Sequence, residues 1–207
     1  MAAFRKAVES EAGIECDLQL SLDGFPMVFH DDDLRRVCGL NVTVDSLDAA
    51  ALMRLHVQRT RECIPWLGDL LKMVDGSVPL LLELKFARGR TERLCASVAA
   101  AVRRYGGPFG VMSFEPVVGE WFATHCPQIR RGLVLDGSDL AWERDGKIAR
   151  SQCDFVAVKT SAVGDSWVAE LRHDGIDVLC WTVRNPKQRA QAAVHADALI
   201  WEADGRP

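Results

Sequence analysis

The 207-residue sequence lacks any apolar run of about 18 residues, the length that a membrane-spanning helix needs. It also lacks an excess of basic residues, because 25 Lys and Arg against 29 Asp and Glu give a formal net charge of −4. Nucleic acids and anionic membrane surfaces both reward basic patches, so this charge favours neither as a partner. No linker rich in Pro, Gly or Ser divides the sequence, and we expect a single domain over 1–207.

No two of the seven cysteines form a Cys-x-x-Cys site, and their number is odd. Several lie in apolar runs, which is typical of buried free thiols and favours a reducing, cytoplasmic setting. The first residues show no signal-peptide pattern, and none is expected within this sequence. It opens with Phe4, Ala7 and Val8 at helical spacing, with no cap and no preceding strand. We therefore expect the chain to begin inside a longer fold, and a lost upstream targeting segment is the open alternative for its localisation.

What the sequence does contain is a recurring unit of an apolar, strand-like run followed by a helical pattern, which predicts parallel strands joined by crossover helices. Seven core strands are expected, at 13–20, 79–85, 109–114, 129–135, 154–159, 178–183 and 198–201. Helices are expected at 2–10, 44–55, 64–74, 91–105, 116–124, 165–172 and 186–194, with Asp45 or Ser46 capping the second. The Asp23-Gly24 pair predicts a hairpin turn into a short strand over 26–30. Seven units are one fewer than a closed (β/α)₈ barrel, and the missing unit belongs at the front.

Glu15 and Asp17 stand two residues apart on the first expected strand, so both carboxylates point to the same face. Two neighbouring carboxylates repel each other and resist burial, which indicates a cation between them. Oxygen ligands suit a hard divalent ion such as Mg²⁺ or Ca²⁺. The alternative is a pair at the strand end that faces water or an arginine.

Glu83 and Lys85 repeat this geometry at the end of the apolar strand over 79–85. Polar residues at the carboxyl ends of barrel strands are typically catalytic. Glu83 is then a third metal ligand and Lys85 a cation for phosphate. A plain Glu–Lys ion pair that fills a layer of the barrel is the alternative.

His30 follows Glu15 and Asp17 by one tight hairpin, so it can return to the same end of the sheet. Histidine suits general acid–base catalysis near neutral pH. Asp31, Asp32 and Asp33 either orient this imidazole or are solvated acids. Weaker candidates end other strands: Ser113, Lys159 and Trp181, the last as a wall of the substrate site or as core.

These segments together resemble the glycerophosphodiester phosphodiesterase family. The resemblance runs in order through Gly-Ile-Glu-Cys-Asp-Leu-Gln-Leu-Ser-Leu-Asp-Gly, Val-Phe-His-Asp-Asp, Ile-Pro-Trp-Leu-Gly-Asp-Leu-Leu, Leu-Leu-Leu-Glu-Leu-Lys, Met-Ser-Phe and Cys-Trp-Thr-Val-Arg-Asn-Pro. It implies an α/β fold of the TIM (β/α)₈ barrel type, here without the first strand. Its implied reaction is hydrolysis of a glycerophosphodiester to glycerol 3-phosphate and an alcohol.

The resemblance also implies roles for single residues. Glu15, Asp17 and Glu83 are the expected ligands of a divalent ion, Mg²⁺ or Ca²⁺. His30 is the expected second catalytic histidine, and Lys85 and Trp181 are the expected substrate contacts. The expected partner is a small-molecule glycerophosphodiester, with no nucleic acid and no membrane span, and the oligomeric state is undetermined.

The sequence departs from the family pattern at both ends. The family opens with a strand that ends in His-Arg-Gly, which is absent before Met1, and its usual ending is altered in Ile-Trp-Glu-Ala-Asp-Gly-Arg-Pro. Loss of an acid–base group commonly lowers the rate by ~10²–10⁴, so we expect a truncated and impaired member. Two alternatives are a degenerate barrel that binds phosphodiesters without turnover and a sphingomyelinase D-like phospholipase.

Overall fold

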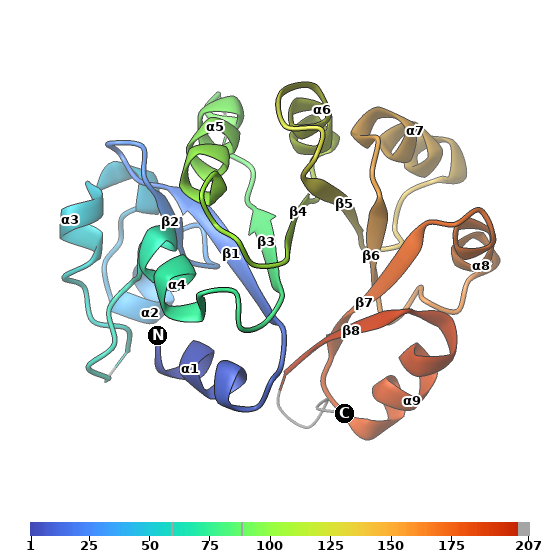
Figure 1. Ribbon diagram of the computed structural model, residues 1–207, viewed down its shortest axis with the longest axis horizontal. Helices are drawn as coiled ribbons and strands as arrows, with labels where there is room; N and C mark the ends of the chain where they lie inside the picture. The colour runs from blue at the N-terminus through green and yellow to red at the C-terminus, as the bar shows by residue number, and fades with distance from the viewer. Residues whose placement is uncertain (59, 88, 203–207) are drawn as a thin grey trace. The chain divides into compact units, whose positions relative to one another are not determined.

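The structure is a computed structural model that describes residues 1–58, 60–87 and 89–202 (Figure 1). Its internal contacts divide the chain into two compact units, Met1–Val111 and Met112–Pro207. The division falls inside strand β4 (Phe109–Ser113). Each unit is described by itself.

The first unit holds the N-terminal half of the secondary structure up to β4. Its elements are α1 (Ala2–Glu9), β1 (Ile14–Leu20), β2 (Pro26–Val28), α2 (Arg35–Cys38), the 3₁₀ helix η1 (Val44–Ser46), α3 (Ala49–Leu52), α4 (Leu67–Val74), β3 (Leu80–Leu84) and α5 (Thr91–Val102). The expected helix at the N-terminus and the expected strands β1 and β3 are confirmed, each shorter by one or two residues.

Strand β1 is half-buried because its residues alternate. Ile14, Cys16, Leu18 and Leu20 are buried, and the polar residues between them face the other way. The strand pairs antiparallel with β2 and parallel with β3, with Asp17 opposite Glu83 in the register. The parallel pairing brings the carboxyl ends of β1 and β3 to the same edge of the sheet.

The Asp23-Gly24 hairpin is also confirmed, although β2 ends at Val28 rather than at residue 30. Gly24 has φ +95°, a left-handed conformation that glycine adopts without strain. Ser21 and Phe25 close the turn through a backbone hydrogen bond of 2.9 Å. The two residues after β2 are therefore loop, and His30 belongs to that loop.

The single helix expected over 44–55 is wrong. Two short helices, η1 and α3, occupy this segment, and extended backbone at Leu47 separates them. The hairpin turn causes the break: the Leu22 N–H donates to the Leu47 carbonyl, and the Asp23 carboxylate accepts from the Ala49 N–H. Tertiary hydrogen bonds thus replace the local cap that Asp45 or Ser46 was expected to supply.

The segment over 27–66 has a small hydrophobic core of its own. Its buried members are Met27, Phe29, Leu34, Val44, Ala49, Leu52 and Ile64. Helix α2 within this segment was not expected from the sequence, because four residues are too few to show helical periodicity. We call this part of the chain the insert segment.

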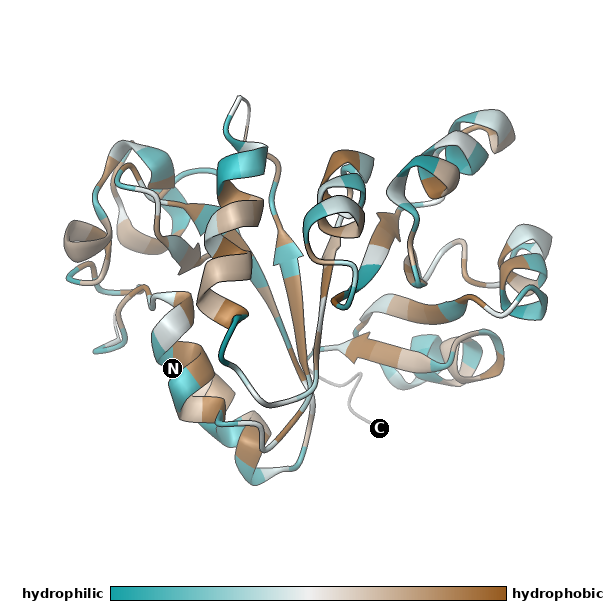
Figure 2. Ribbon diagram, turned by 45° about the horizontal axis from the view of Figure 1, so that its top comes forward, coloured by the Kyte–Doolittle hydropathy of each residue, from teal (hydrophilic) through white to brown (hydrophobic). Residues whose placement is uncertain are grey.

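The second unit contains four parallel strands that alternate with helices. Its elements after β4 are α6 (Pro116–His125), β5 (Arg130–Leu135), α7 (Ala141–Ser151), β6 (Phe155–Lys159), α8 (Ser166–His173), β7 (Asp177–Val183), α9 (Pro186–His195) and β8 (Ala198–Trp201). The strands lie in the order β5-β6-β7-β8. Their apolar runs account for the brown strands of Figure 2, whereas the helices carry teal on part of their surface.

Helix α7 was missed from the sequence. Its residues are mostly polar, Gly146 interrupts them, and Ser151 is its one fully buried residue, so the apolar signal in the sequence is weak. Ile148 is its apolar contact with the core of the second unit, and polar contacts add to it. The Glu143 carboxylate accepts from the Leu140 N–H at 3.0 Å, and Lys147 pairs with Asp139 at 2.6 Å.

Gly119 in α6 marks a close approach of α6 to α7. A β-carbon at Gly119 would lie 2.3 Å from the Ser151 carbonyl oxygen, which is backbone and cannot rotate away. We expect Gly119→Ala to lower the free energy of unfolding by about 1–3 kcal/mol. Gly146→Ala is the matched control, since nothing lies within 4 Å of its β-carbon, and it should raise stability by up to about 1 kcal/mol. Urea titration measures both, and equal effects would contradict the close approach.

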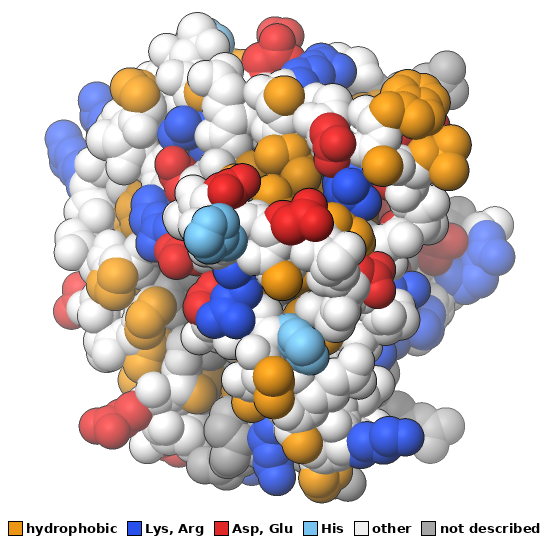
Figure 3. Space-filling view, turned by 90° about the vertical axis from the view of Figure 1, so that its right-hand side faces the viewer, with side chains coloured by type: hydrophobic (Ala, Val, Ile, Leu, Met, Phe, Trp, Pro, Cys, Tyr) orange, Lys and Arg blue, Asp and Glu red, His pale blue; other side chains and the backbone are white. Residues whose placement is uncertain are grey.

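Charged side chains of both signs are interspersed on the side of the second unit that Figure 3 shows. All seven cysteines are free thiols, as the sequence predicted. Across 1–58, 60–87 and 89–202, no helix combines the length and the apolar character that a membrane crossing requires.

Candidate metal centre and active site

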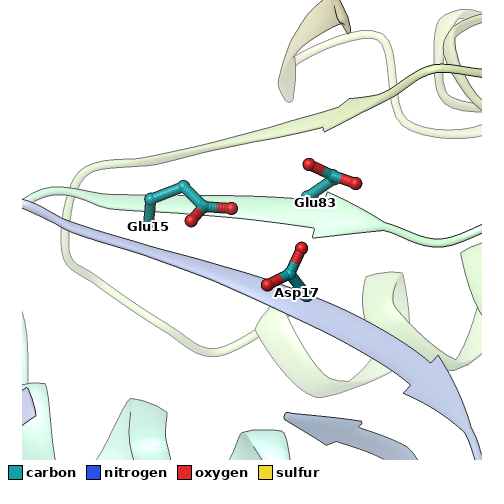
Figure 4. A group of neighbouring side chains, drawn as sticks. All are labelled: Glu15, Asp17 and Glu83. Carbon is teal, nitrogen blue, oxygen red and sulfur yellow. The ribbon is translucent and has the colours of Figure 1, made fainter. Parts of the chain in front are cut away.

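The three carboxylates predicted from the sequence converge in the first unit. Glu15 and Asp17 project from β1 toward Glu83 on the neighbouring β3 (Figure 4). One oxygen of each side chain lies within 4.8 Å of one oxygen of the other two. We call these three residues the carboxylate triad. The parallel register creates it, because Asp17 stands opposite Glu83 and Glu15 precedes Asp17 by one strand period.

The triad is largely removed from water, and its charges are poorly compensated. Burial is the largest cause that raises the pKa of Glu15, to about 8, and the carboxylates of Asp17 and Glu83 add to it. Burial also raises the pKa of Glu83, which is 7% exposed, while Lys85 opposes that rise. Oε1 of Glu15 is buried without a hydrogen-bond partner. Such an atom is costly unless a cation or a donor satisfies it.

Lys85 is the cation nearest to the triad. Its Nζ lies 2.7 Å from Oδ1 of Asp17 and 2.5 Å from Oε1 of Glu83. Its backbone N–H donates to the Leu18 carbonyl at 3.0 Å, which extends the pairing of β1 with β3 by one residue. Burial lowers the pKa of Lys85, but the two carboxylates outweigh it, so the net direction is upward and the amine is protonated. The ion pair considered from the sequence is therefore present.

The triad suits a divalent cation on two grounds. Its donors are three carboxylate oxygens, the ligand type that Mg²⁺ and Ca²⁺ prefer. The unpartnered Oε1 of Glu15 is the atom that Lys85 does not satisfy. Three carboxylates around one ammonium also leave a net negative charge. These observations fit a site for a hard divalent cation.

His30 lies in the loop after β2, with its side chain 70% exposed. Its Nδ1 is 3.0 Å from Oδ1 of Asp31, and Arg36 holds that carboxylate with two hydrogen bonds of 2.6 and 2.8 Å. The Arg36 contact lowers the pKa of Asp31 to about 2, so Asp31 is ionised and can only accept. The shared proton is therefore on Nδ1, which leaves Nε2 for proton exchange. Asp31, not Asp32 or Asp33, orients the imidazole.

Gln19 is a positioning residue that the sequence reading missed. Its Nε2 lies within hydrogen-bond distance of the carbonyls of Phe29, His30 and Asp31 and shares its two protons among them, which ties the His30 loop to β1. The signal was present in the sequence. Gln19 continues the same-face row of Glu15 and Asp17 by one more strand period, so it had to face the same side.

A pocket of about 270 Å³ lies beside the triad, within the first unit. Glu15, Asp17 and His30 line its polar side, together with Arg36. Its apolar side comes from α1 and the insert segment, and includes Phe4, Val37 and Ile64. Acidic ligands, an imidazole and a guanidinium thus face one space that also offers apolar contact.

Trp181 lies on β7 in the second unit. Its indole N–H donates to the Ala157 carbonyl at 3.0 Å, and its ring meets Phe114 edge-on with centroids 5.5 Å apart. Lys159 is its neighbour in the β6–β7 register and is exposed. Ser113 ends β4 and is buried. With its polar atom engaged, Trp181 can offer a ring surface rather than a hydrogen bond.

Chemically, the first unit combines a hard-cation site, a lysine ammonium and a histidine with one nitrogen oriented. This set can screen a phosphate, position it and exchange a proton with one of its oxygens.

The chain matches the sequence model of the Glycerophosphoryl diester phosphodiesterase family over residues 1–205. Among curated proteins, YhdW of Bacillus subtilis (strain 168), provisionally named a glycerophosphodiester phosphodiesterase, is 26% identical over 215 residues. That match covers 97% of this chain and 86% of YhdW.

Solved structures share the fold. A phosphodiesterase from Oleispira antarctica, in complex with the product sn-glycerol-3-phosphate, superposes with a TM-score of 0.89 at 22% identity, covering 99% of this chain and 87% of that one. A glycerophosphodiester phosphodiesterase from Thermotoga maritima gives 0.81 at 22% identity, covering 97% and 86%. These similarities confirm the predicted α/β fold class of the phosphodiesterase-type TIM barrel.

Proposed function

Since this chain belongs to the glycerophosphoryl diester phosphodiesterase family, a family of hydrolases, we propose that it hydrolyses glycerophosphodiesters to glycerol 3-phosphate and an alcohol with the help of a divalent cation. The observation that carries the proposal is the convergence of Glu15, Asp17 and Glu83, with Lys85 against them and His30 on the same pocket. The product complex of the Oleispira antarctica phosphodiesterase supports glycerol 3-phosphate as the retained product.

In this proposal, the carboxylate triad holds the cation, for which Mg²⁺ and Ca²⁺ are the candidates. A bound divalent cation supplies charge screening and orientation to a phosphodiester. Lys85 contributes a positive charge to the phosphate. Trp181 is a candidate substrate contact on the family resemblance alone, and its N–H is already bonded to Ala157.

His30 exchanges the proton. Because Asp31 accepts from Nδ1, the imidazole presents Nε2 to the substrate and can take a proton from the attacking hydroxyl or give one to the leaving oxygen. Gln19 and Arg36 restrict this loop through the backbone of 29–31 and the carboxylate of Asp31. Such restraint keeps the reacting nitrogen in place. Orientation of this kind lowers the activation free energy, because less entropy is lost on reaching the transition state.

The direct test is the release of glycerol 3-phosphate from glycerophosphocholine by the purified chain. We expect release with Mg²⁺ or Ca²⁺, loss of release on chelation, and recovery when the cation is restored, because the triad oxygens need a hard cation. Release that persists in excess chelator would contradict the metal-dependent proposal.

Two other outcomes of these measurements would favour the alternative functions. Cation binding without any release favours a barrel that binds phosphodiesters without turnover. Turnover of sphingomyelin without turnover of glycerophosphocholine favours a sphingomyelinase D-like activity.

A further inference from the structure

The Lys85 ammonium lies between two members of the carboxylate triad. Its Nζ contacts Asp17 at 2.7 Å and Glu83 at 2.5 Å, and its side chain is 21% exposed. The same two residues, together with Glu15, supply the carboxylate oxygens that suit a metal ion. The amine therefore lies between the carboxylates that would bind the cation, and not beside them.

An ammonium and a divalent cation that bind the same carboxylate oxygens repel each other. Divalent cations bind carboxylates at roughly 2.0–2.6 Å, so a cation on Asp17 and Glu83 would lie close to the present Nζ. Two like charges about 4 Å apart repel strongly in a partly buried setting, because little water lies between them to screen the repulsion. The flexible lysine stem can relieve this repulsion by moving.

We propose that Lys85 and the divalent cation compete for Asp17 and Glu83, so that cation binding displaces the ammonium and turns it toward the anionic substrate. In the metal-free chain, Lys85 is the counter-ion of the triad, and its charge is engaged. In the loaded chain, the same charge becomes available to a phosphate. This inference deepens the proposed function, on which it rests.

The consequence is a reciprocal coupling between two ligands. If the cation frees Lys85, it raises the affinity for a phosphate anion, and the anion must raise the affinity for the cation by the same factor. The couplings of ordinary allosteric pairs amount to roughly 5–150-fold, and we expect a value in that range. Metal and substrate would then bind as a cooperative pair through one amine.

The test is calorimetric titration of the full chain at pH 8 with Mg²⁺ or Ca²⁺, alone and with inorganic phosphate. Lys85→Met should bind the cation about tenfold more tightly than the unmodified chain, because the competing charge is gone, and phosphate should no longer change that affinity. Lys72→Met is the matched control, since Lys72 is exposed on α4, and it should behave like the unmodified chain.

Equal or weaker cation binding by Lys85→Met would overturn the competition. Absence of cation binding to the unmodified chain would overturn the metal-dependent function as well, so the two failures are distinguishable. Neither reading depends on turnover.

A second measurement needs no substitution and guards against a Lys85→Met chain that fails to fold. Acetic anhydride labels free amines, and mass spectrometry quantifies each lysine. We expect Mg²⁺ or Ca²⁺ to raise labelling of Lys85 several-fold and to leave Lys72 unchanged as an internal reference. Unchanged or lowered labelling of Lys85 on cation binding would overturn the proposal.

Discussion

Replacing Glu15 by glutamine is expected to stabilise the metal-free chain at pH 8 and to weaken divalent-cation binding by about 100-fold or more. Both effects come from one side chain. Its carboxylate is buried, faces two like charges and has an unpartnered oxygen, so it opposes folding when no cation is present. The same charge is a ligand when a cation is present, and cation affinity follows the number of charged ligands.

The pH dependence of this effect follows from the raised pKa of Glu15, from an ordinary 4.5 to about 8. Below pH 4.5 the group is protonated in both states and has no effect on stability. As pH rises from 4.5 to 8, the unfolded chain releases the proton more readily than the folded chain, and stability is lost. The loss at pH 8 is at most ~4 kcal/mol, and we expect Glu15→Gln to recover about half of it or more.

Urea titration at pH 5 and pH 8 in excess chelator measures this prediction, with calorimetry for the cation. Glu9→Gln is the matched control, because Glu9 is exposed on α1 and the substitution removes the same charge. A Glu15→Gln chain that is less stable than the parent at pH 8, or that binds the cation normally, would show that Glu15 is not a buried ligand.

Replacing His30 by glutamine is expected to lower kcat by ~10²–10⁴, the usual range for loss of an acid–base group. Cation affinity should not change, because His30 contacts Asp31 and not the triad. The fall should appear in kcat rather than in KM, since the imidazole exchanges a proton in the transition state. Its 70% exposed side chain makes a large loss of stability unexpected.

Steady-state kinetics with glycerophosphocholine and calorimetry with Mg²⁺ or Ca²⁺ test this prediction together. His173→Gln is the matched control, because His173 is exposed at the end of α8. Unaltered kcat in His30→Gln would remove His30 from the reaction, and loss of cation binding would make it a ligand instead.

The carboxylate triad was predictable because strand geometry is simple. A period of two places Glu15 and Asp17 on one face, and the carboxyl ends of parallel strands share an edge, which brings Glu83 beside them. The strong hairpin signal of Asp23-Gly24 then returns His30 to that edge. The apolar runs of β5 to β7 predicted parallel strands, because strands that helices cover on both faces are apolar along their whole length.

What was missed from the sequence has three separate causes: distant hydrogen-bond partners, a weak local signal and a rotamer choice. The break between η1 and α3 comes from Leu22 and Asp23, which lie more than twenty residues away in sequence. Helix α7 has few apolar residues and only one fully buried residue, so its sequence gives a weak helical signal. The placement of the Lys85 amine between Asp17 and Glu83 is a choice of rotamer, and residue spacing does not determine it.

The insert segment has a hydrophobic core distinct from the strands that carry the triad, yet its Val37 and Ile64 form a wall of the pocket. The apolar wall of the cavity is therefore separable from the metal ligands, although His30 lies in the same segment as that wall. Divergence among related chains can enlarge, shorten or repolarise this wall, and in the proposed reaction that would change which alcohol group the pocket admits. Such changes leave the spacing of Glu15, Asp17 and Glu83 unaltered. Substrate selectivity can therefore change without a change in the metal ligands.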